Sequence, residues 1–153
     1  MILLATLFAL LSFGTTAAAA NATCRCAPLD SCWPSAKDWA ALNNTIDGRL
    51  IKTVPLGSAC HDPTYNEKEC QKIQDAWDTP ALHLNSASSV MSSQFAYMAN
   101  NSCDPFGPRE TPCGIGAYAQ YAVNVTETRH IAAALKFAQD RNIRVTVKNT
   151  GHE

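Results

Sequence analysis

The chain has 153 residues, of which 46% are hydrophobic and 16% charged, a balance that excludes an intrinsically disordered protein and fits one domain or part of a larger one. Its 12 basic and 13 acidic residues give a formal net charge of -1, without a lysine and arginine cluster. A nucleic acid is therefore not expected as a partner, because neutralising its phosphate backbone requires such a cluster.

Residues 1–20 are predicted to be a cleaved secretory signal peptide. They open with an apolar run and end in Ala18-Ala19-Ala20, which is typical of an apolar core followed by a cleavage site. The alternative is a membrane anchor, but the strongly apolar run of about 12 residues is shorter than the roughly 20 that span a bilayer. We therefore expect a secreted protein with no membrane contact after cleavage. Four N-glycosylation sequons agree with this route, beginning at Asn21, Asn43, Asn100 and Asn124.

Seven cysteines follow the predicted signal: Cys24, Cys26, Cys32, Cys60, Cys70, Cys103 and Cys113. Because disulfides persist in the secretory route, these cysteines are interpreted first as a structural framework. A metal cluster is the alternative, since Cys24-x-Cys26 and Cys60-His61 bring soft ligands close together, but the spacing matches no zinc motif. The odd number leaves at least one thiol free or paired outside this chain. We expect Cys60 to pair with Cys70 and Cys103 with Cys113, each closing a local loop.

Residues 21–115 are predicted to form a cysteine-rich N-terminal region. After an irregular lead-in, Ser35 can cap a helix that carries Trp39 and Leu42 on one face and closes at Gly48. A strand is expected over residues 49–54 and an amphipathic helix over residues 67–77. The proline-rich stretch 103–113 is expected to be a loop held by a disulfide.

Residues 116–153 contain the clearest pattern. Residues 118–125 alternate as a half-buried strand does, and Thr126 or Thr128 can cap a following helix. The helix face is predicted from the spacing of its apolar residues, Ile131, Leu135 and Ala138. A second alternating strand is expected over residues 143–147, leading into Asn149-Thr150-Gly151-His152. A strand, a helix and a strand in this order predict an α+β fold with neighbouring parallel strands and a functional loop at the carboxyl end of the second strand.

Other residues with chemical potential are interpreted as structural. His61, His83 and His130 have no carboxylate at an informative spacing, so surface or hydrogen-bonded structural roles are favoured, with His130 on the solvated side of its helix. Trp33, Trp39 and Trp77 suggest a sugar-binding platform as an alternative, but core anchoring is favoured because Trp39 and Trp77 share helical faces with apolar residues.

The motifs together resemble a known family. The segments concerned are Cys24-Arg25-Cys26, Cys32-Trp33-Pro34-Ser35, Gly48-Arg49-Leu50-Ile51, Ser102-Cys103-Asp104-Pro105-Phe106 and Val147-Lys148-Asn149-Thr150-Gly151-His152. In this order they are similar to the N-terminal region of the secreted fungal FAD-linked oxidoreductases, the berberine-bridge-enzyme-like branch of the vanillyl-alcohol-oxidase superfamily. The likeness covers nearly the whole mature chain.

The resemblance implies that residues 116–153 begin a PCMH-type FAD-binding domain. It assigns cofactor binding to Asn149, Thr150, Gly151 and His152, with FAD bonded covalently to the His152 imidazole at its 8α position. Gly151 would let the backbone approach the cofactor without a Cβ. The tether would raise the reduction potential of the flavin, which would oxidise a small alcohol, sugar or secondary metabolite with dioxygen as acceptor.

Two departures from the family pattern qualify these expectations. The family usually has aspartate after the linking histidine, whereas this chain has Glu153, which keeps the charge on a longer side chain. The catalytic base and the substrate domain would follow Glu153, so no catalytic residue is assigned here. We expect the reading frame to continue past Glu153. At the present length, we expect the enzyme to be inactive or incomplete. The alternative is a cofactor-free, cysteine-rich secreted binding or structural module.

Overall fold

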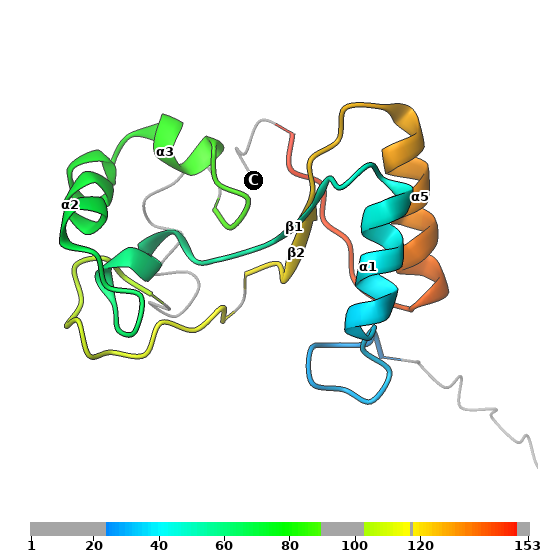
Figure 1. Ribbon diagram of the computed structural model, residues 1–153, viewed down its shortest axis with the longest axis horizontal. Helices are drawn as coiled ribbons and strands as arrows, with labels where there is room; N and C mark the ends of the chain where they lie inside the picture. The colour runs from blue at the N-terminus through cyan, green and yellow to red at the C-terminus, as the bar shows by residue number, and fades with distance from the viewer. Residues whose placement is uncertain (1–23, 90–102, 117, 150–153) are drawn as a thin grey trace, which may run out of the picture.

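The computed structural model describes residues 24–89, 103–116 and 118–149. A two-stranded antiparallel sheet joins two groups of helices (Figure 1). On one side, α1 (Ala36–Thr45) and α5 (Thr128–Asp140) lie against each other. The other side holds the short 3-10 helix η1 (Leu56–Cys60), α2 (Glu67–Ala76) and α3 (Pro80–Leu84). The sheet consists of β1 (Leu50–Lys52) and β2 (Tyr121–Val123).

Helix α1 begins where its capping residue predicts. The Ser35 hydroxyl accepts a hydrogen bond from the Asp38 amide at 3.3 Å, and the Asp38 carboxylate accepts one from the Ser35 amide at 2.9 Å. This reciprocal pair satisfies donors that the first helical turn leaves open. After the helix, Asp47 and Gly48 adopt left-handed φ values of 57° and 74°. The predicted closure at Gly48 is confirmed, and the turn directs the chain into β1.

The hydrophobic core lies between α1, β2 and α5. Trp39, Leu42 and Ile46 form its buried centre. The Trp39 ring stacks on Tyr121 with centroids 3.9 Å apart and lies 4.9 Å from the Phe137 ring. Core anchoring is confirmed for Trp39, and Trp33 packs beside it at 5.7 Å. Trp77 is half-buried and meets His83 edge to face at 4.9 Å.

The predicted pair of neighbouring parallel strands is wrong within the described residues. Strand β2 pairs with β1 in an antiparallel register, Leu50 opposite Val123 and Lys52 opposite Tyr121. Residues 144–148 form no strand, and Ile143 makes one isolated parallel bridge, to Cys26. Alternating apolar residues report an extended backbone, but a strand also needs a neighbour with open donors and acceptors. Val145 and Val147 accordingly remain 46% and 77% exposed.

The predicted face of α5 is also wrong in part. Ala138 is buried as expected, but Ile131 and Leu135 are 46% and 49% exposed. The helix instead packs Ala133 and Phe137 against α1. Both stripes have helical spacing, and the aromatic ring of Phe137 contacts Trp39, so aromatic packing selects the face that is buried.

The disulfides confirm the two predicted pairs. Cys60 is bonded to Cys70 and Cys103 to Cys113, while a third bond joins Cys26 to Cys32 and leaves Cys24 as an exposed free thiol. The first pair fixes η1 to α2, whose N-terminus is capped by Asn66. Gly57 of η1 lies directly on the Cys103 carbonyl, where a Cβ would collide with it. The η1 helix and the 103–113 loop are therefore packed backbone to backbone.

No helix within the described residues has the length and apolar character that crossing a bilayer demands.

Replacing Trp39 by alanine should lower the free energy of unfolding by about 3–5 kcal/mol, because it removes the ring that joins α1 to β2 and α5. Urea unfolding followed by circular dichroism measures this loss. The control is Leu29→Ala, since the Leu29 side chain is fully exposed and its truncation should change stability by less than about 0.5 kcal/mol. Equal losses in the two variants would contradict the assignment of Trp39 to the core.

Candidate functional site

The candidate cofactor turn lies mostly beyond the described structure. Thr150, Gly151 and His152 are outside the described residues, whereas Asn149 is described and exposed. The structure therefore describes the approach to the turn: residues 144–149, which follow α5 and run toward the loop after α3 (Figure 1). We call residues 144–149 the C-terminal segment and residues 83–89 the α3 loop.

Lys148 joins the C-terminal segment to the α3 loop. Its ammonium donates hydrogen bonds to the carbonyls of His83 and Leu84, both at 3.1 Å, and to those of Ser86 and Ser89, both at 2.8 Å. These carbonyls include the last ones of α3, where the helix dipole places partial negative charge. A single cation therefore meets four backbone acceptors that are about sixty residues away in the sequence.

His83 gives the α3 loop its shape from inside. The ring is 1% exposed, with Nε2 2.5 Å from the Trp77 carbonyl oxygen and Nδ1 2.8 Å from the Ser89 hydroxyl. A carbonyl only accepts, so Nε2 carries the proton and Nδ1 accepts from Ser89. His83 therefore has the predicted hydrogen-bonded structural role, and it ties both ends of the loop to the end of α2.

His61 is likewise structural. It is 1% exposed, and its Nε2 donates to the Asp104 carbonyl at 2.8 Å, which ties the residue after η1 to the disulfide loop 103–113. Its Nδ1 has no hydrogen-bond partner within the described residues. The predicted structural role is confirmed.

His130 corrects a sequence prediction. We expected it on the solvated side of α5, but its side chain is completely buried. Its Nδ1 accepts from the Thr126 amide at 3.4 Å, so Nε2 carries the proton and donates to Asp47 at 3.1 Å. Arg129 beside it bonds both Asp47 and Glu127. The sequence prediction assigned only apolar residues to the buried face of the helix and therefore missed His130. An imidazole can be buried at little cost in free energy when both of its nitrogens are hydrogen-bonded.

The charges in this cluster shift its carboxylates. Hydrogen bonds from Arg129, followed by one from His130, lower the pKa of Asp47 below its ordinary 3.8. The hydrogen bond from Arg129 also lowers the pKa of Glu127 below its ordinary 4.5. Asp47, Glu127 and His130 have ligand atoms within 4.8 Å of one another, as metal ligands do. The Arg129 guanidinium, however, already places positive charge on both carboxylates, so the cluster is a structural ion-pair network.

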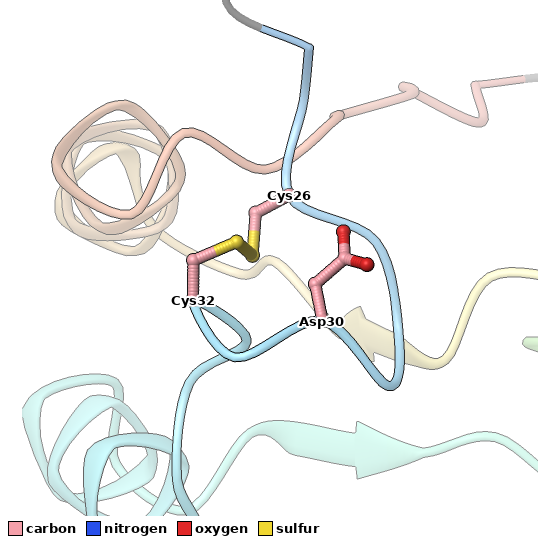
Figure 2. Close-up of side chains that lie close together, drawn as sticks. All are labelled: Cys26, Asp30 and Cys32. Atoms are coloured by element: carbon pink, nitrogen blue, oxygen red, sulfur yellow. A yellow bond between two sulfur atoms is a disulfide. The ribbon is translucent and has the colours of Figure 1, made fainter.

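A second group with metal-ligand chemistry, Cys26, Asp30 and Cys32, is shown in Figure 2. The two sulfur atoms are bonded to each other, so neither is a thiolate that can bind a metal. The Asp30 carboxylate accepts from the Ala27 amide at 2.7 Å within the same loop. The disulfide interpretation therefore holds for this pair, and the loop is a structural closure.

Sequence reasoning gave Lys148 no role beyond its place in the motif that ends at His152. It belongs to an alternating stretch in which a lysine reads as an ordinary solvated position. Its acceptors are backbone carbonyls, which have no sequence signature. Only the arrangement of the α3 loop reveals them.

No family model matches the chain. Among curated proteins, it is 49% identical over 98% of its length to the FAD-linked oxidoreductase sor8 of Hypocrea jecorina and 46% identical over 96% to the FAD-linked oxidoreductase patO of Penicillium expansum. Among solved structures, it matches the VAO-type flavoprotein MtVAO615 of Myceliophthora thermophila with a TM-score of 0.78 and 44% identity over 85% of the chain.

The chain spans 27% of sor8, 25% of patO and 24% of the MtVAO615 chain, about a quarter of each. Over that quarter it is homologous to FAD-linked oxidoreductases and VAO-type flavoproteins, which confirms the resemblance inferred from the sequence motifs.

The lowered pKa of Asp47 predicts a pH-dependent contribution to stability. A carboxylate with a lowered folded pKa stabilises the fold above its unfolded pKa and loses this effect as the pH falls through the folded pKa. Asp47→Asn should therefore lower the melting temperature at about pH 6, and the difference from wild type should shrink at about pH 2. Asp78→Asn, at an exposed position of another segment, controls for the loss of one negative charge. A difference that stays constant over this range would contradict the network.

Proposed function

We propose that the chain forms the flavin-attachment part of a secreted FAD-dependent oxidoreductase, in which His152 bonds covalently to the cofactor. The observation that carries this proposal is the 49% identity over 98% of the chain to an FAD-linked oxidoreductase, joined by fold similarity to a VAO-type flavoprotein. Residues 116–153 would begin a PCMH-type FAD-binding domain. The N-terminal region would support it through the α1–α5 core and the α3 loop.

The chemistry of the residues fits a flavin. A neutral imidazole is a nucleophile, and glycine beside it allows backbone to approach a flat ring system. Asn149 is exposed at the end of the segment that Lys148 secures, so the chain enters the proposed turn from a fixed point. When bound, the flavin would supply hydride acceptance from substrate and electron transfer to dioxygen.

The covalent bond would join an imidazole nitrogen of His152 to the 8α carbon of the flavin. Each of the two atoms would give up one hydrogen, two protons and two electrons in all, and dioxygen would accept them and become hydrogen peroxide. For this step the chain must hold the His152 imidazole neutral and close to the methyl group, which makes its placement the main contribution of this region.

The names of the relatives give a reaction type, FAD-linked oxidation and reduction, and no substrate. A small alcohol, sugar or secondary metabolite is proposed as the substrate, as the resemblance of the sequence motifs implies. The groups that would select among these are not assigned to the described residues.

Secretion and glycosylation are further parts of the proposal. Asn124 is exposed and is the best placed of the described sequons. The Asn43 side chain is half-buried, and its Oδ1 accepts from the Leu50 amide at 2.9 Å, so a glycan on Asn43 would compete with the link between α1 and β1. Asn21 and Asn100 lie outside the described residues.

The test of this function is the mass of the peptide that carries residue 152. The protein is expressed from its complete natural reading frame in a filamentous fungal host, denatured, digested and analysed by mass spectrometry. The wild-type peptide should carry the mass of FAD less two hydrogens, and in His152→Ala the corresponding peptide should carry no flavin. Asn124→Gln serves as a control that leaves attachment unchanged.

An unmodified wild-type peptide would contradict the proposed attachment. A flavin-free protein that melts cooperatively and loses this transition on reduction would instead favour the cofactor-free cysteine-rich module.

A further inference from the structure

We propose that Lys148 is a positioning residue for flavin attachment: its ammonium holds the C-terminal segment on the carbonyls of the α3 loop and thereby sets the place of His152. This inference rests on the proposed function. It adds Lys148 to the residues proposed to serve flavin attachment, and it gives the N-terminal region the role of holding the C-terminal segment in place.

The contacts of Lys148 are more specific than those of a surface lysine. An ammonium has three N–H donors, and here four carbonyl oxygens lie 2.8–3.1 Å from it, so the donors are shared among converging acceptors. Lys136 offers the comparison, because it is exposed and pairs with Asp140 one helical turn away. The Lys148 contacts join segments 59–65 residues apart, whereas the Lys136 contact stays within α5.

The acceptors belong to a loop that is itself fixed. His83 bonds Trp77 at one end and Ser89 at the other, so the loop keeps its carbonyls directed at one point. Trp77 follows α2, and the Cys60–Cys70 disulfide attaches α2 to η1. Lys148 therefore binds a loop that is attached to the disulfide-linked pair of η1 and α2.

Backbone pairing does not hold the C-terminal segment within the described part of the chain. There, residues 144–148 have no strand partner, and the Val145 and Val147 side chains are exposed. Lys148 is four residues from His152, so the chain limits the separation of their Cα atoms to about 14 Å. Anchoring at Lys148 would therefore limit how far His152 can lie from the α3 loop, and a bond-forming step depends on bringing the two reacting groups together.

The experiment compares Lys148→Met with wild type and with the matched control Lys136→Met, all expressed from the complete natural reading frame. Three quantities are measured: total flavin per folded protein, the fraction that stays attached after acid precipitation, and hydrogen exchange of amides in residues 83–89 and 143–149. Lys148→Met should keep total flavin within about twofold and lower the attached fraction on the order of 10-fold to 100-fold, because misplacement acts on bond formation. Exchange in both segments should rise, and Lys136→Met should match wild type.

A second variant, Lys148→Gln, keeps two N–H donors and should lose less of the attached fraction than Lys148→Met. It also decides the question if the methionine variant fails to fold.

The outcomes separate the two proposals. An unchanged attached fraction in Lys148→Met, or a fall of total and attached flavin in step, overturns the positioning role. Unchanged exchange in residues 83–89 overturns the anchor itself. A wild-type protein with no flavin on His152 overturns the proposed function and the positioning role with it, whatever the exchange data show.

Discussion

The stacking of Trp39 on Tyr121 and its contact with Phe137 is the interaction on which the described fold depends, because it joins parts of the chain about eighty to one hundred residues apart. It holds α1 against β2 and α5, so the cysteine-rich region and the C-terminal part share one core. A two-stranded sheet with three residues in each strand has little stability of its own, so the packing of the aromatic rings must stabilise it. The direction in which the chain leaves α5 follows from this packing.

Polar contacts at the two ends of the α1–α5 pair fix the register that the aromatic core leaves open. At one end Asp47 meets Arg129 and the buried His130, and at the other Asp38 meets Arg141. Exposed ion pairs contribute little free energy, but they reject alternative alignments of two helices. The buried His130 imidazole further restricts how the two helices align, since both of its nitrogens are paired only where Thr126 and Asp47 lie within hydrogen-bond distance.

The sequence predicted features whose cause is local. The Ser35 cap, the turn at Gly48 and the two cysteine pairs separated by 10 residues all depend on neighbours along the chain. Features that depend on distant partners were mistaken or missed. Alternation at residues 143–147 indicates extension but does not provide a pairing strand, and Ile131 and Phe137 offer two competing stripes on α5. The burial of His130 and the carbonyls around Lys148 depend on side-chain and backbone acceptors that only the folded chain brings together. The His152 assignment rests on resemblance.

The C-terminal segment shows how a chain can be held in place without a strand ladder. Among the described residues no strand pairs with residues 144–148, yet the three N–H donors of Lys148 are shared among four backbone carbonyl oxygens, and the charge of the ammonium strengthens these hydrogen bonds. Backbone hydrogen bonds between two strands hold residues along the strand but allow its end to fray. A lysine ammonium bonded to several carbonyl oxygens instead holds the one residue whose side chain it is. Because Lys148 stands directly before Asn149, the restraint acts on the residue that leads into the proposed cofactor turn, and through it the α3 loop acts on the same part of the chain.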